Sequence, residues 1–384
     1  MRTPLPRSAT PVFMWLKEIG ILNFKNITEA NLEFCPGVNC LVGSNGMGKS
    51  NMLEAVWYLS MTRSFLRLPD SEVLRHGAES MMVRGEYAMD GSSTETVNLG
   101  FAPPRRKVLK RSGKEYKRLS QHIGTLPVVL VSPQDSYLIT GAPEERRRLM
   151  DTVISQAEPL YLEALIQYGK ALTQRNSMLK SGMFDPILAE GIEMQMETHA
   201  RVIFETRRAW VEAVREPFAR YYAAISGGHE VPSLTYESVL TQMSLRDALA
   251  RNAARDQVLG YTTVGPHRDD LQMLLDGHDL RRLGSQGQMK TYTLALRLAL
   301  FEYLHSRRGV APILLLDDIF DKLDATRVAN IMQLVSSSTA FGQIFITDTG
   351  REHIDRIITQ LPGPYRLFEA REGSYNLLKQ SDKI

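Results

Sequence analysis

The sequence predicts an α/β fold: a mixed β-sheet with additional antiparallel strands near the N-terminus, interrupted by an inserted helical lobe. Two observations predict it. Short apolar strands, turns and a helix occupy the first third of the chain, and a similar pattern returns near its end. Between them, residues 144–222 form an almost continuous helical pattern with few glycines. The helical lobe therefore divides the α/β part into two segments.

Composition narrows the class of protein. The 384 residues are 43% hydrophobic and 23% charged, which excludes a disordered or fibrous chain. The net charge of +3 means that any nucleic-acid-binding surface must be a local patch. The two cysteines, Cys35 and Cys40, exclude a disulfide framework, make a weak metal site and suit a reducing cytosol. No apolar run approaches the roughly 18 residues that span a bilayer, so we expect a cytoplasmic protein without membrane contact.

The N-terminal third contains most of the expected strands. Residues 1–13, rich in Pro, Arg and Ser, are expected to be a disordered leader, with Met14 as a candidate start residue. Residues 15–42 predict antiparallel strands, the last of them buried at Val38–Val42. A helix is expected over about 49–59, and further short strands over 80–130. One of these forms a hairpin over 105–118 that turns at Ser112-Gly113.

The remaining elements define two lobes. Residues 144–222 predict two long helices separated at Ser181-Gly182, and another helix follows over 287–305. Strands are expected over 313–316 and 343–347. We therefore expect one lobe formed by residues 14–135 with 308–384, and an inserted helical lobe formed by residues 136–307.

A phosphate-binding loop follows the strand at Val38–Val42. Its glycines allow backbone N–H groups to point inward at a phosphate, and the following helix adds a positive N-terminal dipole. The lysine would reach the β- and γ-phosphates and the serine hydroxyl would hold Mg²⁺. This pattern predicts binding of a nucleoside triphosphate with Mg²⁺. The loop consists of Gly43, Ser44, Asn45, Gly46, Met47, Gly48, Lys49 and Ser50.

Two acidic residues end the strand over 313–316. Asp317 at the strand tip is placed to hold the Mg²⁺ shell, and Asp318 to orient or deprotonate the attacking water. A strand followed by an ordinary acidic turn is the alternative. Because the phosphate loop is present in the same chain, hydrolysis of the nucleotide is the better interpretation.

A second anion-binding candidate opens the helix over 287–305. Ser285 and Gly287 form a Ser-x-Gly turn at the helix N-terminus. This turn cannot easily serve the phosphate that the 43–50 loop already holds. A head-to-tail dimer, in which it caps the γ-phosphate bound by the partner chain, resolves the conflict. The alternative is a simple helix cap.

The order of these motifs resembles that of the ATP-binding-cassette ATPases of the structural-maintenance and Rad50 type. Within that group the chain resembles the RecF family of bacterial recombination mediators, from about Trp15 to the C-terminus. The matching words are Asn23-Phe24-Lys25-Asn26, the loop followed by Asn51, Arg63-Ser64-Phe65, Ser132-Pro133-Gln134-Asp135, Arg146-Arg147-Arg148, Gln174-Arg175-Asn176, Gly265-Pro266-His267-Arg268-Asp269-Asp270 and Ser285-Gln286-Gly287-Gln288.

The resemblance implies roles for several residues. Gln134 would sense Mg²⁺ and the γ-phosphate, Ser285 and Gly287 would complete the partner's site, and Asp324 would cross the dimer interface. Lys25 matches a basic position near the nucleotide, and Arg63 a γ-phosphate or DNA contact. The resemblance suggests no chemical role for His267 or Arg268.

Two departures from the wider group bear on catalysis. The usual glutamate after the Mg²⁺-binding aspartate is Asp318 here, one methylene shorter, so we expect slow hydrolysis that serves as a switch. The usual switch histidine is absent, and Thr347 or Thr349 is the candidate γ-phosphate sensor.

A basic segment over 105–118 is the candidate DNA contact. Alternate residues of a hairpin strand share a face, so several of its charges would form one stripe suited to duplex phosphates. A solvated surface is the alternative, and Arg146-Arg147-Arg148 could equally pair with Glu144 and Glu145. No base-reading helix is recognisable. The basic residues are Arg105, Arg106, Lys107, Lys110, Arg111, Lys114, Lys117 and Arg118.

The leading functional hypothesis is an ATP-dependent DNA-binding clamp with weak, DNA-stimulated ATPase activity. ATP would close a homodimer on duplex DNA beside a single-stranded gap, and slow hydrolysis would release it. The resemblance implies loading of RecA with RecR and RecO, replication restart and the SOS response. One alternative is an ATP-gated protein adaptor that does not bind DNA. Another is a small-molecule kinase, disfavoured because the Ser285 turn would then have no function.

Overall fold

The computed structural model describes residues 14–89, 93–182, 185–319, 341–359 and 363–382, with four single residues between 327 and 334. The expected leader, residues 1–13, and Asp324 lie outside the described residues. Two compact units are present: one contains the chain up to Pro133 and from Leu300 onward, and the other is Gln134–Ala299. An insertion of one unit into the other is thus visible in the chain order.

The first unit is built on a six-stranded mixed sheet with the order β15-β14-β3-β13-β12-β8. Every neighbouring pair from β14 to β8 is parallel, whereas β15 is antiparallel to β14. In parallel sheets ligands bind at the carboxyl ends of the strands, so the edge where β3, β13 and β12 end is the place to look for a site. The strands are β3 (Val38–Val42), β8 (Val128–Val131), β12 (Ile313–Asp317), β13 (Ile344–Asp348), β14 (Tyr365–Arg371) and β15 (Ser374–Ser381).

An antiparallel sheet with the order β2-β1-β4-β5-β6-β7 completes the first unit. Helix α1 (Lys49–Met61) contacts strands of both sheets, and for this reason almost all of its residues are buried. One hydrophobic core surrounds it, with Trp57, Tyr58 and Leu59 among its members. The strands are β1 (Trp15–Phe24), β2 (Ile27–Glu33), β4 (Met81–Ala88), β5 (Thr94–Phe101), β6 (Val108–Arg111) and β7 (Lys114–Glu115).

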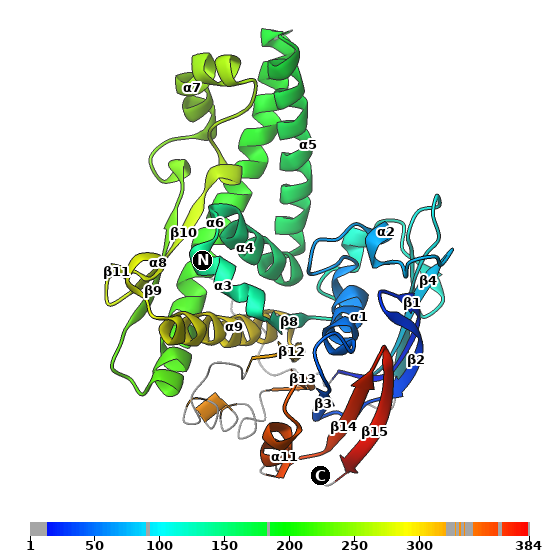
Figure 1. Ribbon diagram of the computed structural model, residues 1–384. Coiled ribbons are helices and arrows are strands. Elements are labelled where there is room, and N and C mark those ends of the chain that lie inside the picture. The colour runs from blue at the N-terminus through cyan, green and yellow to red at the C-terminus, as the bar shows by residue number, and fades with distance from the viewer. Residues whose placement is uncertain are drawn as a thin grey trace. The chain divides into compact units, whose positions relative to one another are not determined.

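The second unit contains three helices where the sequence predicted two. The expected first helix is divided into α4 (Pro143–Ala157) and α5 (Pro159–Ser181), because Pro159 lacks the N–H that would continue α4. Helix α6 (Pro186–Ser226) starts at Asp185, whose side chain accepts hydrogen bonds from two backbone N–H groups. Figure 1 shows α5 and α6 running side by side as the long axis of this unit.

The second unit also contains a three-stranded antiparallel sheet that the sequence analysis missed. Strands β9 (Pro232–Glu237), β10 (Asp270–Leu275) and β11 (His278–Asp279) pair in the order β11-β10-β9. The inserted lobe therefore contains a small sheet in addition to the expected helices. Its other helices are α3 (Ser136–Thr140), α7 (Leu245–Leu259), α8 (Leu280–Leu283) and most of α9 (Gln286–Arg308).

The remaining described elements are short. In the first unit they are α2 (Asp70–Val73) and α11 (Arg351–Thr359). Within the described residues, no helix is both long and apolar enough to cross a membrane. Both cysteines are buried and free of disulfide bonds.

Candidate functional site

The loop between β3 and α1 curls in a way that only glycine allows at two positions. Gly43 has φ 153° and Gly48, which caps α1, has φ 102°, and side chains avoid both conformations. A Cβ atom at Gly43 would also lie 2.5 Å from the carbonyl oxygen of Ala370. Ser44, Asn45 and Gly46 are exposed, so the tip of the loop is accessible to a ligand. The predicted strand–loop–helix context is confirmed.

Lys49 is buried and folds back over this loop. Its Nζ donates to the carbonyl oxygens of Gly43 at 2.6 Å and Ser44 at 2.9 Å. Burial lowers the pKa of Lys49, while the carboxylates of Asp318, Asp317 and Asp348 act in the opposite direction. A desolvated ammonium at the loop is suited to replace these carbonyl contacts with phosphate oxygens.

The acidic end of β12 lies beside the start of α1. Ser50 Oγ donates to Asp317 Oδ1 at 2.8 Å, although the two residues are 267 positions apart. Hydroxyl and carboxylate oxygens are the ligands that Mg²⁺ prefers, so this pair fits the predicted metal role. Within the described residues, no group of three or more His, Cys, Asp or Glu side chains forms a further metal site.

Thr347, at the end of β13, links the two acids. Its Oγ1 donates to Asp317 Oδ1 at 2.7 Å and accepts from the backbone N–H of Asp318 at 3.0 Å. Asp318 has φ 48°, a left-handed conformation that costs a side-chain-bearing residue about 1–3 kcal/mol. The Thr347 hydroxyl therefore supports the acidic pair, and sensing of the γ-phosphate by Thr347 or the exposed Thr349 stays a prediction.

Lys25 and Asn51 occupy the flanks of the loop. Lys25 forms an ion pair with Glu54 of α1, and the other carboxylate oxygen of Glu54 accepts from Ser64. Asn51 Nδ2 donates to Asn26 Oδ1 at 2.7 Å. Arg63 is exposed. The family-like words at 23–26 and 63–65 thus meet at α1, with the cation of Lys25 already paired.

The remaining predicted catalytic residues belong to the second unit. Gln134 is exposed in the turn Pro133–Asp135. The backbone N–H of Ser285 donates to Gln288 Oε1 at 2.7 Å, and the Gln288 N–H donates to Ser285 Oγ at 3.2 Å. This reciprocal pair is a capping box. The helix-cap alternative is therefore realised, while Ser285 itself remains exposed together with the start of α9.

Two of the three consecutive arginines anchor the start of β10. Arg146 forms a two-pronged ion pair with Asp270, at 2.6 and 2.9 Å. Arg147 Nη1 donates to the carbonyl oxygen of Asp269 at 2.7 Å. The predicted pairing with Glu144 and Glu145 is confirmed for Arg148.

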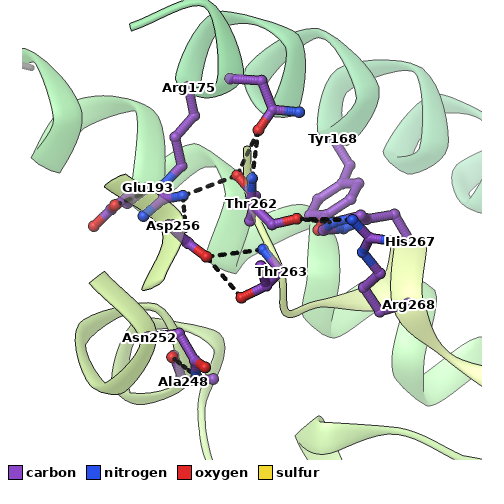
Figure 2. Close-up of polar contacts among 11 residues, drawn as sticks. Tyr168, Arg175, Glu193, Ala248, Asn252, Asp256, Thr262, Thr263, His267 and Arg268 are labelled. Atoms are coloured by element: carbon purple, nitrogen blue, oxygen red, sulfur yellow. Dashed lines mark hydrogen bonds and ion pairs between the residues drawn. The ribbon is translucent and has the colours of Figure 1, made fainter. Parts of the chain in front are cut away.

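A second buried arginine joins α5 to α7 and to the segment before β10. Figure 2 shows Arg175 between Glu193, Asp256 and Thr262. Its Nη1 lies 2.7 Å from Asp256 Oδ2 and 2.8 Å from Thr262 Oγ1, and its side chain is only 2% exposed. In the same view His267 lies between Tyr168 and the backbone of Thr262.

Arg207 of α6 completes this framework. Its guanidinium pairs with Asp269 at 3.0 Å and Asp151 at 2.8 Å, and donates to the carbonyl oxygen of Pro266 at 2.8 Å. Both charges of the Arg207–Asp269 pair are almost fully buried. Removing one partner would leave the other unpaired in the interior, so the motif over 265–270 is a structural element of the second unit.

Comparisons with known proteins show which family the chain is similar to. The family profile described as "RecF/RecN/SMC N terminal domain" matches residues 15–366. A protein named "DNA replication and repair protein RecF" from Parabacteroides distasonis is 46% identical over 367 residues, which cover 96% of this chain and all of the relative. One from Porphyromonas gingivalis is 46% identical over 94% of this chain and 99% of the relative.

The chain belongs to the RecF family. The solved structure titled "Structure of the recombination mediator protein RecF-ATP in RecFOR pathway" is similar, with TM-score 0.84 and 31% identity over 95% of this chain and 99% of that chain. An Smc head domain from Pyrococcus furiosus, 17% identical with TM-score 0.57 over 96% of both chains, shares the fold. The fold is therefore that of the ABC-type ATPase heads, with an inserted arm.

The basic hairpin of this RecF-family chain is shorter than predicted. The turn at Ser112-Gly113 is confirmed, with φ 46° and 81°, but only β6 and β7 pair around it. Adjacent strand residues point to opposite faces, so Lys110 and Arg111 do not share a stripe. Lys107 is tied to Asp70 and Arg111 to Glu95. The other basic residues are exposed: Arg105, Arg106, Lys110, Lys114, Lys117 and Arg118.

Tyr375 contacts the phosphate loop and was not among the predicted site residues. Its hydroxyl donates to the carbonyl oxygen of Gly48 at 2.8 Å, from the C-terminal hairpin of β14 and β15. No local motif surrounds Tyr375, so sequence reasoning had no signal for it. Asn26 lay within a family-like word, but its contact with the loop is visible only in three dimensions.

Proposed function

We propose that this chain is an ATP-dependent, DNA-binding recombination and repair mediator of the RecF type, acting in the cytoplasm. The observation that carries the proposal is the meeting of Lys49, Ser50, Asp317 and Thr347 at the carboxyl edge of the mixed sheet. RecF-named relatives over nearly the whole chain, and a structure titled as a RecF–ATP complex, support it.

The chain's own residues suggest how ATP is handled. The loop N–H groups would hold the α- and β-phosphates and Lys49 would reach the β- and γ-phosphates. Ser50 and Asp317 would hold Mg²⁺, which would neutralise phosphate charge. Asp318 orients the attacking water. Its side chain is one methylene shorter than glutamate, so hydrolysis is slow and acts as a switch.

The proposed dimer completes the site. Ser285 and Gly287 lie in a separate unit from the phosphate loop, and their turn is exposed at the N-terminus of the 23-residue helix α9. We infer that in an ATP-bound homodimer this turn faces the γ-phosphate held by the other copy, with Asp324 and Gln134 contributing as in the wider group. Such a dimer forms only while ATP is present.

The six exposed basic residues of the segment over 105–118 provide the proposed DNA surface. They would contact phosphates, so they select duplex DNA and junctions with single strands by shape and charge, not by sequence. Loading of RecA with RecR and RecO, replication restart and SOS induction follow for this chain from its similarity to RecF, including a structure placed by its title in the RecFOR pathway.

An ATP-gated adaptor without DNA contact is the competing proposal, because two of the eight basic residues are already ion-paired within the fold. The discriminating experiment replaces Lys110, Lys114 and Lys117 together by Gln. A matched control replaces Arg201, Arg208 and Arg215, exposed on α6, so that both variants lose three positive charges.

Binding to gapped duplex DNA is measured with ATP over a range of salt concentrations. The hairpin variant is expected to bind at least ten-fold more weakly, and its salt dependence to fall by roughly one unit per lost phosphate contact. The α6 variant should bind like the unmodified protein. Equal DNA affinity of the unmodified protein and the hairpin variant would support the adaptor instead.

A further inference from the structure

Three consecutive carbonyl groups of the phosphate loop accept hydrogen bonds from outside the loop. Asn26 Nδ2 donates to Gly46 O at 3.4 Å, the N–H of Gly373 to Met47 O at 3.0 Å, and Tyr375 OH to Gly48 O at 2.8 Å. Two of the donors belong to the β14–β15 hairpin. The third lies in the turn between β1 and β2.

These contacts fix the direction of the loop N–H groups. In a trans peptide the carbonyl of one residue and the N–H of the next point in opposite directions. Since the carbonyls of Met47 and Gly48 point at the hairpin, the N–H groups of Gly48 and Lys49 point away from it, toward the concave side of the loop. These are donors that a bound phosphate would need.

The turn between β1 and β2 and the β14–β15 hairpin together form a clasp around the loop. They lie so close to Gly48 that a side chain at that position would meet them. A Cβ atom at Gly48 would lie 3.0 Å from Asn26 Oδ1 and 3.1 Å from Tyr375 OH. A Cβ atom at Gly373 would lie 2.5 Å from the carbonyl oxygen of Asn26, so the two outer segments also approach each other closely. Gly48 therefore serves this outer contact as well as the curl around a phosphate.

Asn26, in the turn that forms one side of the clasp, is held by two further hydrogen bonds. Asn26 Oδ1 accepts from Asn51 of α1 at 2.7 Å, and the Asn26 carbonyl accepts from Arg75 at 2.9 Å. Burial raises the pKa of Tyr375, so its hydroxyl remains a hydrogen-bond donor. Asn26 is thus held in place before any nucleotide arrives.

We propose that Tyr375, with Asn26, is a positioning residue that holds the phosphate loop in its phosphate-binding conformation. It acts through the backbone and contacts no reacting atom. The inference rests on the proposed function, since it concerns the loop that would bind ATP. Because loop N–H groups surround the α- and β-phosphates, the clasp should matter equally for ATP and ADP.

The test is Tyr375→Phe, with Tyr365→Phe as matched control. Tyr365 starts β14 of the same hairpin, and its hydroxyl forms no hydrogen bond within the described residues. Gly48 O also accepts from the N–H of Met52 at 3.1 Å, so losing the tyrosine hydroxyl leaves no unpaired carbonyl. The melting temperature of the nucleotide-free protein should therefore hardly change.

Dissociation constants for ATP and ADP are measured by titration, and hydrolysis at saturating ATP separately. Tyr375→Phe is expected to weaken both nucleotides about three- to ten-fold, the usual effect of one hydrogen bond, with kcat within two-fold of the unmodified protein. Tyr365→Phe should bind both normally. Affinities of Tyr375→Phe equal to those of the unmodified protein overturn the inference, as does a loss confined to ATP.

Asn26→Asp provides a second test of the inference if Tyr375→Phe does not fold. It keeps the oxygen that accepts from Asn51 but removes the donor to Gly46 O, so ATP and ADP must again both bind more weakly. Unchanged binding by this variant overturns the inference too. If the unmodified protein binds neither nucleotide, the proposed function itself fails, which is a different result.

Discussion

The hydroxyl of Thr347 makes two hydrogen bonds that hold the acidic end of β12 in place. One fixes the carboxylate of Asp317, and the other supports the left-handed backbone of Asp318. Valine has nearly the same shape but neither bond. We therefore expect Thr347 to position the groups that carry out hydrolysis, whether or not it also senses the γ-phosphate.

Thr347→Val should slow single-turnover ATP hydrolysis by about ten-fold or more, because losing both bonds loosens Asp317 and Asp318 together. Nucleotide affinity without Mg²⁺ should stay within about two-fold, since the phosphate loop is untouched, while the Mg²⁺ concentration for half-maximal activity should rise. Thr349→Val, at the next exposed threonine, is the control. If Thr347→Val hydrolysed ATP at the normal rate and Thr349→Val did so more slowly, the residue that supports hydrolysis would be Thr349 and not Thr347.

The site could be predicted from sequence where its chemistry is local. The phosphate loop is eight consecutive residues with an obligatory backbone geometry, and Asp317-Asp318 ends an unmistakably apolar strand. The positions of Thr347 and Tyr375 beside them depend on which strands are neighbours in the mixed sheet. No spacing along the chain encodes that order.

At the scale of elements, the segment that leads into β10 is joined to helix α5 through His267. Its Nδ1 lies 2.8 Å from Tyr168 OH, and its Nε2 lies 3.0 Å from the carbonyl oxygen of Thr262. Burial lowers the pKa of His267 to about 4. The folded protein therefore keeps this imidazole neutral at pH values where an unfolded chain would protonate it.

The sign of the pH effect follows. The unfolded state, with an imidazole pKa near 6.5, binds more protons than the folded state below that pH, so acidification favours unfolding. The stability due to neutral His267 is complete above pH 6.5 and is lost as the pH falls toward 4. Between pH 7.5 and 5 this amounts to about 2 kcal/mol of unfolding free energy.

His267→Gln should remove that part of the acid sensitivity, since glutamine does not titrate. Urea unfolding at pH 7.5 and 5 measures it, as the difference between the two free energies of unfolding. His229→Gln is the control, because His229 is exposed in the same unit and its replacement should leave the difference unchanged. An equal pH dependence in all three proteins would show that His267 is not held neutral.

Element types were predictable where periodicity is long, and boundaries or short strands were not. Helices α1, α6 and α9 follow from apolar periodicity and clear end signals. The sheet β9–β10–β11 was missed because its strands are short and far apart in sequence. The end of α4 has a visible signal in Pro159, which the continuity of helix-forming residues on both sides concealed.

At the scale of the whole molecule, the residues of the proposed hydrolysis site are divided between the two units of the chain. Lys49, Ser50 and Asp317 belong to one unit, and Ser285 to the other. The long helical pattern over 144–222 led us to expect an inserted lobe. The structural role of the motif over 265–270 could not be predicted from the sequence. Its partners Arg147 and Arg207 are far away along the chain and come into contact with it only in the folded protein.

The double role of Ser285 decides how the proposed dimer should be tested. Bulky substitutions would disrupt the capping box and destabilise α9. A loss of dimerisation in such a variant would then say nothing about a contact with the γ-phosphate. Asp and Asn both cap helices well and are nearly the same shape, so they differ here mainly in charge.

Ser285→Asp should keep the melting temperature and ATP binding of the unmodified protein, yet fail to dimerise with ATP, because its carboxylate would face the partner's γ-phosphate. Light scattering in an Asp318→Asn background measures this, with Ser285→Asn, expected to dimerise, as its neutral counterpart. Full ATP-driven dimerisation of Ser285→Asp would mean that this turn only caps its own helix.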